Sequence, residues 1–156
     1  MIKQPSSTAH RRRLARSAAG FTLVELIVTV AILAILAVVA LPAYRQYVAK
    51  SRRADAISAL ATVQQAQERW RANKPGYADS LADMGLPANA DAKHYDIAIK
   101  NASATGYTLV ATPRAGGLQT ADSDCSSMSI TMKGGTSKYG ALNGANSDSA
   151  DTCWPK

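Results

Sequence analysis

The pattern of apolar and polar residues changes sharply along the chain. Between Phe21 and Leu41 the chain is almost wholly apolar, and its only charged side chain is that of Glu25. As an α-helix rising 1.5 Å per residue, this stretch is about 31 Å long, enough to cross the hydrocarbon core of a bilayer. A helix that is apolar on every face can also be the core of a large protein, but roughly 115 following residues are too few to enclose it. We therefore expect a membrane-spanning helix.

Helix-favouring residues continue beyond this stretch to about Asn73, and Lys74-Pro75-Gly76 then predicts a stop. Pro42 is expected to bend the helix, because proline lacks the amide donor and clashes with the preceding turn. Residues spaced by three and four predict a weak apolar face, made of Ile57, Leu60, Ala61, Gln64, Gln67 and Trp70. The opposite face is expected to carry Arg52, Arg53, Asp55 and Glu68.

Three later segments alternate apolar and polar residues and predict β-strands: 95–99, 107–111 and 128–132. Turn-forming residues link the first two, so the strands are expected to form an antiparallel meander packed on the helix, an α+β fold. Residues 77–92 are expected to be an irregular connection. Gly134-Gly135 predicts a turn, and the closing segment containing Gly140 and Gly144 predicts a loop.

The first 20 residues are basic and contain no acid; their cations are Lys3, Arg11, Arg12, Arg13 and Arg16. A basic segment before an apolar one also describes a secretory signal peptide. However, the apolar run is longer than the usual 7 to 15 residues, and the small residues 17–20 precede it instead of following it. This order indicates a cut on the cytoplasmic side that leaves the anchor attached.

Charge says little about the orientation of the chain or about its partners. Five basic residues precede the span and four follow it closely, so the positive-inside rule barely decides. From Phe21 onward the chain has 13 basic and 11 acidic residues, a net charge of +2. Without a clustered basic stripe in the sequence, nucleic acid is not the expected partner.

Cys125 and Cys153 are the only cysteines, and both lie beyond the apolar span. One cysteine pair in a small domain beyond a membrane anchor predicts a disulfide formed outside the cytoplasm. A metal site is the alternative, although neither cysteine has a second ligand at the usual spacing and His94 is isolated. No paired carboxylates, nucleophile with histidine, or phosphate-binding loop is evident, so we do not expect an enzyme or a cofactor.

The segment Ser17-Ala18-Ala19-Gly20-Phe21-Thr22-Leu23-Val24-Glu25-Leu26 resembles the processing site of type IV prepilins. The resemblance implies that a membrane peptidase cuts after Gly20 and methylates the new amino terminus at Phe21. Glu25 then matches the glutamate at the fifth position of mature pilins, and Pro42 matches their helix-kinking proline. The disulfide region ending in Cys153-Trp154 is similar to that of type IVa pilins, particularly PilE-like minor pilins.

Physical chemistry gives Glu25 a role consistent with this resemblance. A carboxylate inside a membrane span is unfavourable by up to about 3 kcal/mol and is a candidate functional residue. The resemblance implies that Glu25 of an incoming subunit pairs with the free amine of Phe21 on a neighbour. The simpler alternative is that Glu25 reaches toward the cytoplasmic headgroups.

The resemblance also predicts the organisation and location of the protein. It implies a cleaved leader at 1–20, a transmembrane and polymerisation helix at 21–48, and a globular pilin domain at 49–156. The expected location is the bacterial inner membrane, with the globular domain in the periplasm, and then the extracellular pilus. The expected partners are other pilin subunits, the prepilin peptidase and methyltransferase, and the inner-membrane assembly machinery. Two alternatives remain open: a pseudopilin of a type II secretion system, and a minor pilin that binds DNA for uptake.

Overall fold

The computed structural model describes residues 20–155, so the predicted leader lies outside the described residues except for Gly20. The chain forms two compact units, and the boundary between them lies between Val39 and Ala40. The first contains most of the apolar part of helix α1 (Leu23–Arg71). The second, which we call the globular unit, contains the rest of that helix and a β-sheet.

Helix α1 is 49 residues long and confirms the continuous helix expected from the sequence. It begins after Thr22, whose Oγ1 accepts a hydrogen bond from the Glu25 backbone N–H at 3.2 Å. This is the Thr half of a capping box, in which threonine is followed three residues later by glutamate. The helix remains intact through Pro42 and ends before Lys74-Pro75-Gly76. Whether Pro42 bends the helix stays a prediction.

The buried face of α1 differs from the expected one because it includes an arginine. It consists of Arg53, Ala56, Ala59, Leu60, Val63, Ala66 and Gln67. Leu60 and Gln67 were expected there, but the placement of Arg53 on the exposed face was wrong. The cause is an acidic partner in a distant loop, Asp122, which the helical spacing could not reveal.

The sheet has four antiparallel strands in the order β1 (Tyr95–Lys100), β2 (Gly106–Pro113), β3 (Ser127–Lys133) and β4 (Thr136–Leu142). The three predicted strands are confirmed, but the prediction of a loop after Gly135 was wrong, because residues 136–142 form β4. This strand lies at the edge of the sheet, and only Ala141 in it is buried, so it lacks apolar alternation. Gly134 and Gly135 form the predicted turn with positive φ angles of 55° and 82°, which glycine favours.

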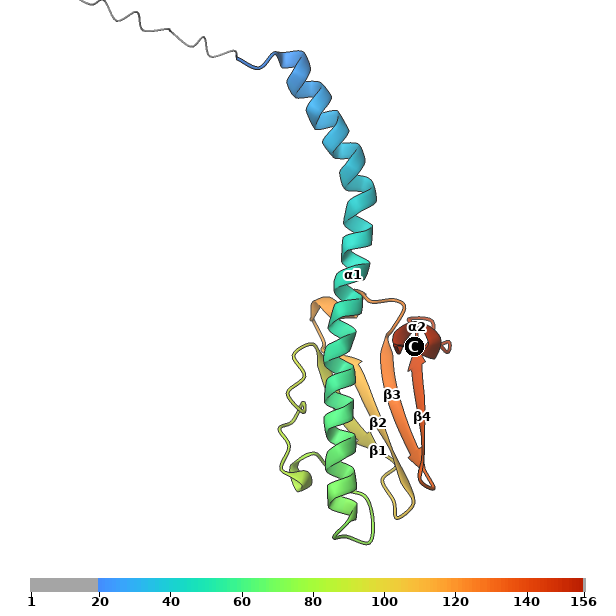
Figure 1. The fold of residues 1–156 in the computed structure, drawn as a ribbon. Helices are drawn as coiled ribbons and strands as arrows, with labels where there is room; N and C mark the ends of the chain where they lie inside the picture. Colours follow the sequence, from blue (N-terminus) through green and yellow to red (C-terminus); the bar gives the residue numbers. More distant parts are fainter. Residues whose placement is uncertain (1–19, 156) are drawn as a thin grey trace, which may run out of the picture. The chain divides into compact units, whose positions relative to one another are not determined.

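The core lies between the second half of α1 and one face of the sheet (Figure 1). Leu60 and Val63 of the helix pack in one cluster with inward-facing strand residues, including Tyr95, Leu109 and Ile130. Burial of these apolar side chains is the main force that holds the domain together.

The irregular connection between α1 and β1 is fixed to the helix at both ends. The side-chain amide of Gln67 donates to the Ala78 carbonyl at 2.7 Å and accepts from the Ala78 N–H at 2.9 Å. Farther along, the Asp55 Oδ2 accepts the N–H groups of Lys93 and His94, each at 2.8 Å. Between them lies the short 3-10 helix η1 (Ala82–Met84). The polar residues of α1 therefore satisfy loop backbone groups that would otherwise lack partners.

Candidate functional site

The apolar part of α1 is an unpartnered hydrophobic surface. All residues from 20 to 47 are exposed in the isolated chain. Among the described residues, α1 contains the single span long and apolar enough to cross a membrane, with a mean hydropathy of 2.9 over its most apolar window. An exposed apolar surface of this extent requires lipid or other protein around it.

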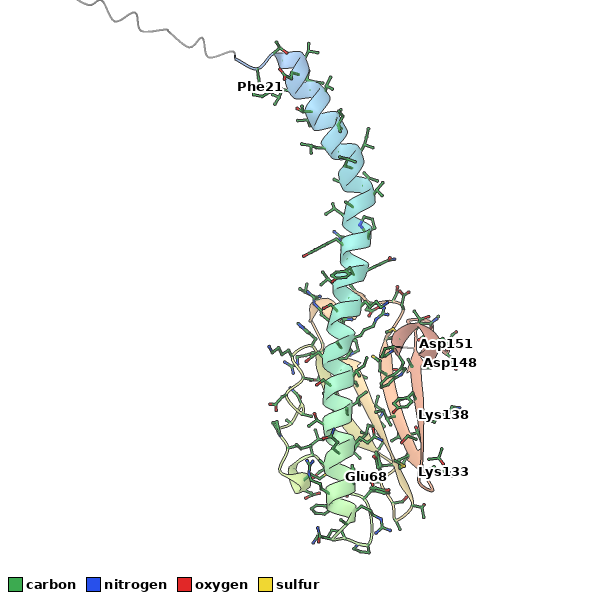
Figure 2. All side chains as sticks on the ribbon, in the orientation of Figure 1. Phe21, Glu68, Lys133, Lys138, Asp148 and Asp151 are labelled. Atoms are coloured by element: carbon green, nitrogen blue, oxygen red, sulfur yellow. A yellow bond between two sulfur atoms is a disulfide. The ribbon has the colours of Figure 1, made fainter. Side chains whose placement is uncertain are left out.

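The predicted processing residues lie at the start of this surface. Phe21 lies two residues before the first residue of α1 and is 81% exposed (Figure 2). Gly20 is exposed, and a Cβ added there would meet no atom within 4 Å. Among the described residues, the Glu25 carboxylate has no ion pair. Hence neither the fold nor a local contact of the described chain explains Gly20 or the Glu25 side chain, and the proposed roles depend on other molecules.

Cys125 and Cys153 form the predicted disulfide, with an S–S distance of 1.99 Å and Cα atoms 5.8 Å apart. The bridge holds a C-terminal segment, which includes the short helix α2 (Ala150–Cys153), against the edge strand β4. The Ser149 N–H donates to the Ala141 carbonyl at 3.0 Å, and the Trp154 Nε1–H donates to the Gly140 carbonyl at 2.9 Å. The segment therefore satisfies carbonyl groups at a sheet edge that could otherwise recruit another chain.

A buried polar network links α1 to the loop between β2 and β3. The Arg53 guanidinium donates to both carboxylate oxygens of Asp122, at 2.8 and 2.7 Å, and to the Thr152 carbonyl at 3.3 Å. Gln119, in the 3-10 helix η2 (Leu118–Ala121), donates to Asp122 at 2.7 Å and to the Ala49 carbonyl at 3.3 Å. The hydrogen bond to Asp122 raises the pKa of Arg53. Burial raises the pKa of the adjacent Tyr95 to about 12, so this phenol is neutral at physiological pH.

Three chain segments meet at the end of the domain where α1 stops. The Tyr77 N–H donates to the Ser103 carbonyl at 3.0 Å, which joins the end of the helix region to the β1–β2 turn. The Gly134 N–H donates to the Thr105 carbonyl at 2.9 Å, which joins the β3–β4 turn to the same place. Turns far apart in the sequence thus meet at one end of the domain.

The segments that meet here carry six cations, which we together call the basic end: Arg69, Arg71, Lys74, Lys100, Lys133 and Lys138. All are exposed except Arg71, which is half-buried. One acid, Asp83, lines a shallow pocket together with Arg69 and Lys74. Figure 2 shows Lys133 at one end of the sheet, Asp148 and Asp151 at the opposite end, and Lys138 between them along β4. The sequence analysis missed the basic end because these cations come from five separate segments: α1, the turn after it, β1, β3 and β4.

A row of side chains crosses the sheet at the basic end. The strand register places Lys100 opposite Thr108, Thr108 opposite Thr131, and Thr131 opposite Lys138. The two threonine hydroxyls lie 3.4 Å apart. This row lies on the face away from α1, because Thr108 and Thr131 alternate with the buried Tyr107 and Met132. It presents hydroxyl groups between two cations.

The residues that the structure describes give no basis for a metal site. Among the described residues, no group of three or more histidine, cysteine, aspartate or glutamate side chains could hold a metal ion. His94 contributes its backbone N–H to Asp55 and its carbonyl to the Arg114 N–H at 3.0 Å. The cysteines are in the disulfide, so the metal alternative for them was wrong.

A long helix with an exposed apolar half, an antiparallel sheet packed on its other half, and a disulfide-bounded C-terminal region together define a type IV pilin fold. Comparison with known families agrees. Residues 42–129 match the family described as "Type IV minor pilin ComP, DNA uptake sequence receptor", and residues 15–41 match the "Prokaryotic N-terminal methylation motif". The chain belongs to this family of type IV minor pilins.

A characterised fimbrial protein is also similar. The chain is 30% identical over 99 residues to "Fimbrial protein EcpC" of Eikenella corrodens. The similar region covers 64% of this chain and 65% of that protein, slightly less than two thirds of its length. The similarity supports a fimbrial protein, in agreement with the family.

Proposed function

We propose that this chain is a minor subunit of a type IV pilus that is processed after Gly20, assembles through its apolar helix, and binds DNA at its basic end. The observation that carries the proposal is the coexistence, in one chain of this pilin family, of the processing motif and three lysines, Lys100, Lys133 and Lys138, exposed on β1, β3 and β4 beside two threonines of the outer sheet face. The family description supplies the DNA hypothesis, which the balanced charge of the sequence alone did not favour.

Processing is the first step of this proposal. Before it, the chain is held in the inner membrane by α1, with the globular unit in the periplasm. The prepilin peptidase then cuts between Gly20 and Phe21, and methylation occurs on the new amine of Phe21. Because both residues are exposed and Gly20 has open space around it, an enzyme can reach this bond without disturbing the fold.

Replacing Gly20 with valine is expected to abolish processing while leaving the globular unit folded. The added side chain meets nothing within the described chain, so the effect must arise in the peptidase site. Immunoblotting of membranes should show only the full-length precursor, and mass spectrometry should find no methylated peptide that begins at Phe21. Gly144→Ala is a suitable control, since it changes an exposed glycine in the other compact unit, outside the processing motif. A mature-sized product from Gly20→Val would contradict the proposed site.

Assembly is the second step. When subunits leave the bilayer, their apolar helices bury one another, driven by the same hydrophobic effect that favoured lipid. Repeated contacts that do not close into a ring produce a helical fibre. Within this apolar environment, the Glu25 carboxylate pairs with the protonated Phe21 amine of a neighbouring subunit, which compensates for the removal of both charges from water.

Replacing Glu25 with alanine is expected to preserve membrane insertion and cleavage but to reduce incorporation into fibres by at least about tenfold, equivalent to about 1.4 kcal/mol. The measurement is the amount of this subunit in sheared pili relative to the amount in membranes. Glu68→Ala provides a matched control, because Glu68 is an exposed acid on the same helix outside the apolar region. Normal incorporation of Glu25→Ala would show that the charge pair is unnecessary.

The proposal of DNA binding depends on where the cations of the basic end lie and not on the net charge of the chain. Lys and Arg side chains neutralise phosphates and release counterions, which makes binding depend on salt. Threonine hydroxyls, such as those of Thr108 and Thr131, can donate to phosphate oxygens and fix the position of the duplex. A net charge of +2 for the chain after Gly20 is compatible with this binding, because phosphate contacts depend on the local cations instead of the total charge.

Replacing Lys100, Lys133 and Lys138 together with glutamine is expected to weaken binding to duplex DNA. If each lysine contacts one phosphate, the slope of log K against log salt should decrease by about 3 in magnitude. All three side chains are exposed, so the fold should persist. The full chain in detergent would be titrated with labelled duplexes at several salt concentrations, with Lys93→Gln as an exposed control outside the basic end. An unchanged slope, or no binding by the original chain at low salt, would exclude DNA binding at this surface.

A further inference from the structure

A groove on the globular unit lies between the first turns of α1 beyond Leu41 and the 3-10 helix η2. It has a volume of about 640 Å³. We call it the η2 groove, and its main lining residues are Tyr44, Arg45, Val48, Arg52, Leu118 and Asp124. Neither the core nor the basic end includes it, and the proposed pilin and DNA functions do not use it.

The two walls of the η2 groove are fixed relative to one another. Gln119 of η2 donates to the Ala49 carbonyl on α1, and it also holds the Asp122 carboxylate that binds Arg53. This network is buried, so water competes poorly with its hydrogen bonds. The groove is therefore a preformed surface, which lowers the entropy lost when a ligand binds.

The groove combines free cations with exposed apolar groups. Arg53 is neutralised by Asp122, and Asp124 lies 3.6 Å from the same guanidinium. Arg45 and Arg52 have no ion pair among the described residues. Beside them, the Leu118 side chain is 75% exposed and Tyr44 is 66% exposed. A ligand that complements these groups has an anionic oxygen group attached to an apolar part.

The position of the groove along α1 indicates the source of this ligand. Arg45 is four residues beyond Leu41, about 6 Å along the helix, and Arg52 is about 16 Å beyond it. The headgroup layer extends roughly 5 to 8 Å beyond each side of the hydrocarbon core. Side chains on a helix tilt toward its amino terminus, so the long Arg52 side chain reaches back toward this layer. Tyr44 and Tyr47 follow the apolar stretch within six residues, and aromatic residues are common at the borders of membrane spans.

We propose that, before the subunit assembles, the η2 groove binds the phosphate headgroup of an anionic phospholipid. Arg45 and Arg52 bind the phosphate oxygens, which guanidinium groups recognise through paired hydrogen bonds. Leu118 and Tyr44 contact the apolar part of the same lipid. The inference rests on the membrane-anchored state proposed above and does not depend on DNA binding. Such a site would hold the globular unit at the membrane surface until lipid is exchanged for neighbouring subunits.

The test is lipid retention by the full chain in detergent micelles, measured by native mass spectrometry. Phosphatidylglycerol and phosphatidylcholine would be added separately at equal concentration. We expect selective retention of phosphatidylglycerol, and Arg45→Gln and Arg52→Gln should each weaken it by about fivefold. Lys93→Gln should leave retention unchanged, because Lys93 is exposed outside the groove. Equal retention of both lipids, or unchanged retention by both arginine variants, would overturn the proposal.

Two further measurements identify the occupant of the groove. Inorganic phosphate at the same concentration as the lipid should fail to displace phosphatidylglycerol; displacement would indicate a free-anion site instead. In proteoliposomes, a photoreactive residue at position 118 should crosslink to lipid. Crosslinking to a second copy of the chain, without lipid adducts, would assign the groove to subunit contacts and overturn the lipid proposal.

Failure of this inference is distinguishable from failure of the proposed pilin function. Lipid retention is measured on unassembled protein, whereas Glu25→Ala and the basic-end variants report fibre incorporation and DNA binding. If the arginine variants lose neither lipid nor fibre incorporation, only the lipid site is excluded. If the original chain retains lipid but never enters fibres, only the assembly proposal is excluded.

Discussion

Arg53→Ala is expected to lower the free energy of unfolding of the globular unit by about 3 to 5 kcal/mol. The side chain of Asp122 is only 2% exposed, so the substitution leaves a buried carboxylate without its cation. It also removes the donor to the Thr152 carbonyl, next to the disulfide. The measurement is thermal and urea unfolding of the full chain in detergent, followed by near-ultraviolet circular dichroism.

The adjacent arginine provides a matched control for this prediction. Arg52 carries the same charge on the same helix but has no ion pair among the described residues, so Arg52→Ala should change stability by less than about 1 kcal/mol. Removing both partners, Arg53 and Asp122, should be less destabilising than the sum of the single alanine substitutions. Equal melting temperatures for Arg53→Ala and Arg52→Ala would show that the buried ion pair does not stabilise the domain.

Replacing Cys125 and Cys153 together with serine is expected to destabilise the domain by about 3 to 4 kcal/mol. The bridged residues are 28 positions apart, and the loop-entropy model gives this magnitude for a closed loop of that length. Changing both cysteines avoids leaving a reactive thiol. In addition, hydrogen exchange of the Ser149 amide should accelerate, because its bond to the Ala141 carbonyl depends on the docked C-terminal segment.

Reduction of the original disulfide gives an independent form of the same test. A reducing agent should lower the melting temperature of the original chain and leave that of the double serine variant unchanged. Loss of the docked segment also uncovers the β4 edge, so the reduced protein should aggregate more readily. Identical melting temperatures of the original chain under oxidising and reducing conditions would contradict this role of the bridge.

The Arg53 network and the disulfide both hold the C-terminal segment, so the losses of stability caused by removing each of them should not be additive. Arg53 binds the carbonyl of Thr152, and the next residue, Cys153, is in the disulfide. Once the segment has left β4, the second substitution has less structure to disrupt. The combination of Arg53→Ala with the cysteine substitutions should therefore cause a smaller loss than the sum of its parts.

Local sequence patterns were sufficient for several features. The run from Phe21 to Leu41, the stop at Lys74-Pro75-Gly76 and the three apolar strands depend on neighbouring residues, and the structure confirms the helix and strands. Only two cysteines were present, so the disulfide had one possible pairing within the chain. The processing residues Gly20, Phe21 and Glu25 were recognised from a short contiguous motif and remain a proposal.

The edge strand and the buried arginine were missed for a common reason. Strand β4 forms through backbone hydrogen bonds to β3 and through cover by the C-terminal segment, and these require little apolar alternation. Arg53 is buried because Asp122, 69 positions away, compensates for its charge. Residue spacing within one element contains no information about such distant partners.

The sequence by itself determined the apolar half of α1, the extent of that helix, three of the four strands, the single disulfide and the processing motif, because each depends on residues close in the chain or on a unique pair. Tertiary structure alone decided that Arg53 is buried, that residues 136–142 form an edge strand, and which cations from five segments make up the basic end. It also decided that α1 and η2 enclose a groove. These features arise from contacts between distant residues, and the packing of the helix on the sheet determines which of them meet.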